Sequence, residues 1–175
     1  ILMLSSLKEY KGTREFIELA NRLPQYKFVL VINDTDKNID RYLKDNDLTF
    51  VNRGGNLIIC SRQSDVIPFY NSASLVINLT NPLFAVETFG LTTLEAMTNG
   101  LPVIVPTRGG IAEMVENGIN GYKIDVQDLK NITEQICRIL ENRNLYSSLS
   151  ANALKCSTKY HYSCTLYNLI NSLEE

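Results

Sequence analysis

Two glutamates, Glu87 and Glu95, stand eight positions apart on either side of a Phe-Gly turn. Carboxylates accept hydrogen bonds from sugar hydroxyls. The free N–H groups and positive dipole end of a helix start attract phosphate. Glu95 is expected near such a helix start and Glu87 in the loop ahead of it, so the stretch is suited to a nucleotide-sugar. The alternative is that a glutamate in the first turn of a helix only complements the helix dipole.

The residues on both sides of this stretch predict the elements that position it. Residues 75–79 form a short aliphatic run of the kind found in a buried parallel strand. Residues 92–99 contain good helix formers and end at Gly100-Leu101-Pro102, which is typical of a helix end. The glutamates therefore lie between a strand and a helix, at a sheet edge where α/β proteins bind ligands.

A lysine and a glycine, Lys11 and Gly12, close the loop that follows the first predicted strand. Ligands of open α/β sheets bind beyond the carboxyl ends of the strands, so this loop is expected in the same crevice as residues 87–95. There Lys11 has three N–H donors for a diphosphate, and Gly12 lets the backbone turn into the next helix. The alternative is a solvated surface lysine, which is a common fate of lysine.

Residues 107–113 carry a second glycine-rich turn, Gly109-Gly110, ahead of a predicted helix at 111–116. Successive amides there could form an anion-binding nest, and a purely structural turn is an equal alternative. Glu113 is expected to serve the helix start. His161 lies between two tyrosines and far in sequence from the crevice loops, so it is interpreted as structural.

No metal or redox site is predicted. The chain has one histidine and four cysteines without metal-ligand spacing, and no Ser-His-Asp or Cys-His arrangement can be assembled. A net charge of −2 argues against nucleic-acid binding, and no apolar run approaches the ~20 residues that span a bilayer. The expected location is cytoplasmic, with reduced thiols, and no cofactor is expected.

Short apolar runs alternate with longer amphipathic segments, which predicts βαβ units. We therefore expect one α/β domain over residues 1–175, with a Rossmann-like doubly wound parallel sheet of about six strands, helices on both faces and a helical C-terminal tail. The chain opens in mid-strand, as expected of a domain from a longer protein. The predicted strands are Ile1–Ser5, Lys27–Ile32, Thr49–Asn52, Leu57–Ser61, Leu75–Leu79 and Pro102–Val105. The other predicted helices are Thr13–Leu23, Asn38–Asp45, Ser64–Asn71, Leu129–Leu140, Leu145–Tyr160 and Cys164–Leu173.

The order of these motifs resembles the C-terminal domain of family 4 retaining glycosyltransferases, which have the two-domain GT-B fold. The resemblance runs from Ser5 to the last helix. Its hallmark is the glutamate pair with seven residues between, and in combination its motifs are highly specific. They are Glu87-Thr-Phe-Gly-Leu-Thr-Thr-Leu-Glu95-Ala-Met, Gly100-Leu-Pro-Val-Ile-Val, Gly109-Gly-Ile-Ala-Glu113 and Asn117-Gly-Ile-Asn-Gly121.

The resemblance implies a role for each site residue. Glu95 would accept hydrogen bonds from the ribose hydroxyls, and Glu87 would face the donor sugar near its anomeric carbon. Lys11 would hold the phosphates and stabilise the leaving group, without a metal ion. The backbone amides that would bind the sugar and the diphosphate are those of Phe89, Gly90, Leu91 and Thr92.

One position departs from the family pattern. Five residues before the lysine the family often has an arginine as a second phosphate clamp, and this chain has Ser6. A hydroxyl brings a hydrogen bond but no charge. Either Lys8 or Arg62 replaces the missing cation, or diphosphate binding is weaker.

The resemblance also implies what lies outside the chain. The acceptor, a glycan or a lipid-linked glycan, would bind an N-terminal domain absent from this sequence. The full-length protein would transfer a hexosyl group in polysaccharide or glycolipid synthesis, at the inner face of the membrane if it is peripheral there. The chain alone would bind the donor without turnover.

Three other functions remain open. The first is a non-catalytic nucleotide-sugar-binding module. The second is a nucleotide-sugar epimerase of related architecture, which would not be expected to have a Phe-Gly turn inside the glutamate pair. The third is a dinucleotide-dependent oxidoreductase, against which the loop after the first strand argues, because it has no Gly-x-Gly-x-x-Gly.

Overall fold

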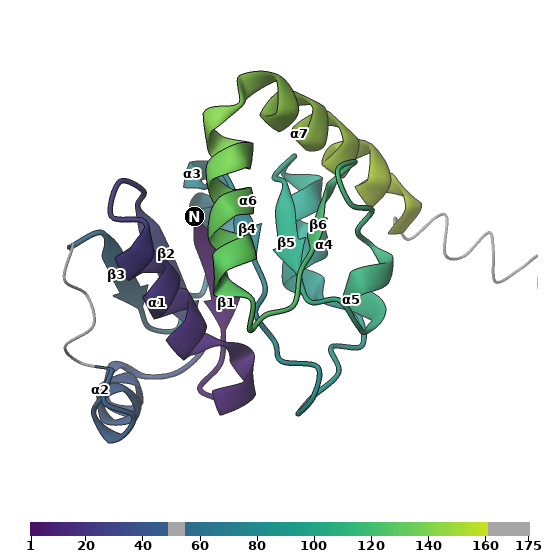
Figure 1. Cartoon of the computed structure of the whole chain (residues 1–175). Helices are drawn as coiled ribbons and strands as arrows, with labels where there is room; N and C mark the ends of the chain where they lie inside the picture. The colour runs from purple at the N-terminus through teal and green to yellow at the C-terminus, as the bar shows by residue number, and fades with distance from the viewer. Residues whose placement is uncertain (49–54, 161–175) are drawn as a thin grey trace, which may run out of the picture.

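The computed structural model describes residues 1–48 and 55–160. These residues form a six-stranded sheet with the strand order β3-β2-β1-β4-β5-β6 (Figure 1). Every pairing between neighbouring strands is parallel. The order reverses between β1 and β4, which is the doubly wound arrangement predicted from the sequence. The strands are β1 (Leu2–Ser5), β2 (Phe28–Ile32), β3 (Leu57–Cys60), β4 (Val76–Ile77), β5 (Val103–Val105) and β6 (Gly121–Lys123).

Helices cover both faces of the sheet, as predicted. In Figure 1, α1 and α6 lie side by side over one face, and α4 lies behind the sheet. Helix α5 packs into the same core as α4. The α-helices are α1 (Thr13–Arg22), α2 (Asp36–Asp45), α3 (Ile67–Ser72), α4 (Leu91–Thr98), α5 (Gly110–Glu113), α6 (Leu129–Glu141) and α7 (Arg143–Ser157). Two short 3-10 helices, η1 (Glu9–Lys11) and η2 (Thr158–Tyr160), complete the described elements.

The sheet separates two apolar cores, because successive side chains of a strand point to opposite faces. Met3 and Ile104 pack into the core under α1 and α6, whereas their neighbours Leu2 and Val103 pack into the core under α4 and α5. Both cores contain aliphatic residues from several strands, so each strand reads as a continuous apolar run. The central strands are thereby held firmly, and their carboxyl ends are fixed relative to one another.

Two predicted segments need correction or cannot be assessed. The predicted strand Thr49–Asn52 and helix Cys164–Leu173 lie outside the described residues, as does His161. The sixth strand is instead β6, which the sequence did not reveal because Gly-Tyr-Lys has no apolar run. Gly121 opens this strand beside β5, where a Cβ would lie 2.2 Å from the carbonyl oxygen of Val103.

The strand that precedes the glutamate pair is shorter than predicted, because β4 ends at Ile77. Its ladder continues for one more bond, from the N–H of Asn78 to the carbonyl of Ile104 at 2.9 Å. The side-chain oxygen of Asn78 then accepts the N–H of Thr80 at 3.0 Å, which turns the chain away from the sheet. The residues after this turn reach the ligand-binding edge of the sheet.

A partly buried side-chain amide, that of Asn56, joins the end of α1 to the start of β3. The Asn56 side-chain nitrogen donates to the carbonyls of Ala20, Leu23 and Tyr26 at 3.0, 3.1 and 2.7 Å. Asn56→Ala is expected to lower the free energy of unfolding by about 1–3 kcal/mol, because partly buried carbonyls lose their donor. Urea denaturation measures this change. Asn144→Ala, at an exposed position on α7, is the control and should change stability by less than about 0.5 kcal/mol; equal losses would contradict the assignment.

Candidate functional site

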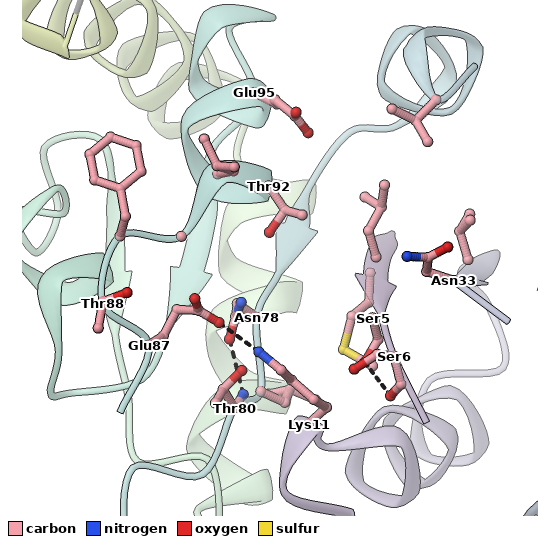
Figure 2. A pocket seen from close by; sticks show the side chains of 18 of the residues that line it. Ser5, Ser6, Lys11, Asn33, Asn78, Thr80, Glu87, Thr88, Thr92 and Glu95 are labelled. Atoms are coloured by element: carbon pink, nitrogen blue, oxygen red, sulfur yellow. Dashed lines mark hydrogen bonds and ion pairs between the residues drawn. The ribbon is translucent and has the colours of Figure 1, made fainter. Parts of the chain in front are cut away.

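A cleft of about 580 Å³ opens at the carboxyl ends of β1 and β4, where the strand order reverses. Its walls come from the loop after β1, the loop between β4 and α4, and the first turns of α4 (Figure 2). A hydrogen bond of 2.7 Å from the N–H of Asn81 to the carbonyl of Tyr10 ties the first two loops together. The predicted site residues that line the cleft are Ser6, Lys11, Glu87, Phe89, Gly90, Leu91, Thr92 and Glu95.

Lys11 and Glu87 form an ion pair across the cleft. The lysine Nζ lies 2.6 Å from Glu87 Oε2, and about three quarters of each side chain is buried. Figure 2 shows the two side chains approaching from opposite walls. The Lys11 ammonium also lies 5.8 Å from the centre of the Tyr10 ring. Lys11 is therefore a fixed cation at the cleft and not a solvated surface lysine.

Glu95 is held by a tyrosine that the sequence did not point to. The hydroxyl of Tyr70, on α3, donates to Glu95 Oε2 at 2.6 Å. Burial, with the nearby Glu95 carboxylate, raises the pKa of Tyr70 well above its ordinary range, so the hydroxyl keeps its proton. Glu95 is the fifth residue of α4, and the first turn of that helix holds no acidic residue. The dipole explanation for Glu95 is therefore wrong.

The start of α4 presents backbone donors to the cleft. Gly90 is the N-cap residue, with φ +82°, and α4 begins at Leu91, one residue earlier than predicted. The first N–H groups of a helix have no partner within it. Because Gly90, Leu91 and Thr92 all line the cleft, these N–H groups lie at its wall. The helix start can therefore bind an anion there.

The Gly109-Gly110 turn is structural. A Cβ on Gly110 would lie 1.8 Å from the carbonyl oxygen of Thr88, and one on Gly109 would lie 2.5 Å from that of Glu87. The two glycines thus allow the turn before α5 to contact the backbone that carries Glu87. Neither glycine lines the cleft. Glu113 lies in the first turn of α5, as predicted.

The cations proposed to replace the missing arginine lie elsewhere. Arg62 does not line the cleft, and its Nε donates to the side chain of Asn33 at 2.8 Å. Lys8 is exposed and is also absent from the lining. Of the lysines and arginines in residues 1–48 and 55–160, Lys11 alone lines the cleft. Ser6 lies in the cleft as a neutral residue.

Several cleft residues were missed by the sequence analysis. Asn33 and Asn78 each follow the last residue of a strand, β2 and β4, and both line the cleft. Their position after a strand was a signal available in the sequence. Thr80 and Thr88 also line the cleft. Thr88 lies inside the glutamate motif without having been assigned a role, and Thr80 belongs to no recognisable motif.

Two further features are absent from residues 1–48 and 55–160. No group of three or more histidine, cysteine, aspartate or glutamate side chains there could hold a metal ion. None of the helices in that part of the chain has the length and apolar character needed to cross a bilayer.

Comparison with known proteins places these features in a family. The model of the family "Glycosyl transferases group 1" matches residues 1–155. A sucrose synthase from Melioribacter roseus is 45% identical over 86 residues, which are 47% of this chain and 11% of that protein. The capsular polysaccharide biosynthesis glycosyltransferase CapM of Staphylococcus aureus is 28% identical over 150 residues, covering 83% of this chain and 37% of CapM.

A solved structure shares the fold. The structure of HepE from Anabaena in complex with UDP-glucose superposes with a TM-score of 0.75 at 21% identity, over 98% of this chain and 48% of HepE. The chain thus spans about half the length of HepE and a smaller share of the other two relatives. Since the family model covers most of its length, the chain belongs to the group 1 glycosyltransferases.

Proposed function

We propose that this chain is the nucleotide-sugar-binding half of a retaining hexosyltransferase of family 4 that acts in glycan synthesis. The observation that carries the proposal is the meeting of Lys11, Glu87, Glu95 and the start of α4 in one cleft. A cation and free amides suit a diphosphate, and carboxylates suit sugar hydroxyls. The donor is a nucleoside diphosphate sugar, and the proposal includes no metal ion or other cofactor.

The phosphate-binding part of the cleft explains how the donor would be activated. When the bond between the anomeric carbon and the phosphate oxygen breaks, its electron pair stays on the diphosphate. Negative charge therefore grows there and is stabilised by fixed positive charge. Lys11 supplies a full charge and the start of α4 supplies partial charge. Ser6 adds a hydroxyl donor at the same wall.

The two glutamates have separate roles in the proposal. Glu95 lies on α4 beside Tyr70 and is assigned to the ribose hydroxyls. Glu87 lies beside Lys11, which is assigned to the diphosphate. Because the sugar is attached to the diphosphate, Glu87 is assigned to the transferred sugar. Retention of the anomeric configuration rests on the resemblance of the glutamate motif described above.

The relatives support the donor class and the biological setting. HepE was solved with UDP-glucose, and CapM is named for capsular polysaccharide biosynthesis. This chain spans 48% of HepE and 37% of CapM. We therefore assign the acceptor, a glycan or lipid-linked glycan, to a further domain of a longer protein, and propose that residues 1–175 are one donor-binding domain.

Calorimetry with UDP, GDP and ADP tests the proposal. At least one of them is expected to bind, and at a concentration of 100 times its Kd to raise the free energy of unfolding by about 2.7 kcal/mol. Glu95→Ala is expected to weaken that binding about tenfold, because a hydrogen bond to a charged group contributes about 1.5–3 kcal/mol. Glu134→Ala, on α6 and outside the cleft, is the control. Absence of binding by all three at millimolar concentration would contradict the proposal.

A further inference from the structure

Tyr70 is a buried residue whose hydroxyl reaches the edge of the cleft. Its side chain is 2% exposed and packs in the core between α3 and α4. The hydroxyl donates to Glu95 Oε2 at 2.6 Å and lies 3.3 Å from the carbonyl oxygen of Thr92. Both of these residues line the cleft, whereas Tyr70 does not. The tyrosine therefore lies in the core next to the cleft and contacts residues of the cleft wall.

The bond from Tyr70 limits how the Glu95 carboxylate can turn. Glu95 is exposed, and an exposed glutamate otherwise samples several rotamers. One of its oxygens is held by a hydroxyl on a buried, rigid ring, and the other, Oε1, has no hydrogen-bond partner among the described residues. The carboxylate therefore faces the cleft in one orientation before a ligand arrives.

Packing by itself does not account for the hydroxyl. A phenylalanine has the same ring and fills nearly the same volume, so the core would accept it. The hydroxyl matters only for the polar atoms it contacts, and the shortest of these contacts is with Glu95. We propose that Tyr70 is a positioning residue that holds the Glu95 carboxylate in the orientation in which it accepts the ribose hydroxyls of the donor nucleotide. This inference rests on the proposed function.

A pair of ligands separates this role from a structural one. The probes are UDP, or GDP or ADP if one of these is the nucleotide that binds, and the matching 2′,3′-dideoxy nucleotide. Tyr70→Phe is expected to weaken binding of the ribonucleotide about three- to tenfold, the size of one ordinary hydrogen bond. Binding of the dideoxy nucleotide, which has no hydroxyls for Glu95, is expected to change by less than about twofold. Calorimetry measures both.

A remote tyrosine provides the matched control. Tyr26 also donates its hydroxyl to a glutamate, Glu141 Oε1, at 2.8 Å, and neither residue lines the cleft. Tyr26→Phe removes the same chemical group and is expected to leave binding of both nucleotides unchanged. Thermal unfolding of each variant checks that the fold is kept.

A double variant tests whether Tyr70 acts through Glu95. The combination of Tyr70→Phe and Glu95→Ala is expected to bind the ribonucleotide no more weakly than Glu95→Ala alone, because the bond is already lost. Full additivity would overturn the inference, as would an equal effect of Tyr70→Phe on both nucleotides. In either of these two outcomes the wild type still binds the nucleotide, so only the inference about Tyr70 fails. If the wild type binds no nucleotide, the proposed function fails and the inference fails with it.

Discussion

Replacing Gly12 with alanine is expected to lower the free energy of unfolding by about 2–4 kcal/mol. Gly12 has φ +78°, and a Cβ there would lie 2.3 Å from Leu79 Cβ and 2.6 Å from the Leu79 carbonyl oxygen. The left-handed backbone costs alanine about 1 kcal/mol, and overlap with backbone atoms adds about 1–3 kcal/mol. The contact matters for the site because Gly12 follows Lys11 and Leu79 follows β4. Urea denaturation measures the loss of stability.

A second glycine separates the two causes. Gly55 also has a positive φ, +65°, and an added Cβ there would meet nothing within 4 Å. Gly55→Ala thus carries the backbone cost without the steric one, and is expected to destabilise by about 1 kcal/mol. Equal losses of stability in the two variants would contradict the steric contribution of Leu79 at Gly12.

Replacing Lys11 with methionine is expected to weaken binding of a nucleoside diphosphate about 10- to 100-fold. A hydrogen bond between charged groups contributes about 1.5–3 kcal/mol, and the described part of the cleft holds no second lysine or arginine to substitute. Calorimetry measures the change. Lys8→Met is the control, since Lys8 lies three positions earlier, is exposed and does not line the cleft. An affinity of Lys11→Met within twofold of the wild type would contradict the phosphate assignment.

The ion pair between Lys11 and Glu87 is expected to oppose binding of a diphosphate. Glu87 Oε2 holds the Lys11 ammonium at 2.6 Å, so a diphosphate must compete with the carboxylate for Lys11. Glu87→Gln is expected to raise affinity for the nucleoside diphosphate without a sugar about three- to tenfold, because a neutral amide holds the ammonium less strongly. In the Lys11→Met background this gain should vanish. A gain that persists would indicate general charge repulsion by Glu87 in place of competition for the lysine.

Much of the fold could be predicted because its signals are local. The buried strands are short apolar runs, and α1 repeats its apolar residues at helical spacing. The predicted bounds differ by a few residues where tertiary contacts decide them. Thus β4 stops at Ile77 because Asn78 turns the chain with its own side chain. The strand β6 was missed because its three residues depend on β5 for their conformation.

The candidate site was predicted in its residues and not in its contacts. The glutamate spacing, Lys11 and the helix start can be recognised in the sequence. All predicted site residues line the cleft except Arg62, whose side chain bonds to Asn33. No sequence pattern indicated a role for Tyr70 in the site, because a tyrosine in a short predicted helix is expected to be a core residue. Its hydroxyl bond to Glu95 spans 25 positions, and nothing local specifies it.

Patterns within the chain are enough to predict the alternation of strands and helices, the glutamate pair and a lysine for a diphosphate. Three contacts exist only in the folded chain: Lys11 meets Glu87, 76 positions later, Tyr70 holds Glu95, and Gly109-Gly110 supports a loop and does not form an anion nest. The strand order explains why. β1 and β4 are neighbours in the sheet but distant in the chain, so their loops meet only when the whole sheet is assembled.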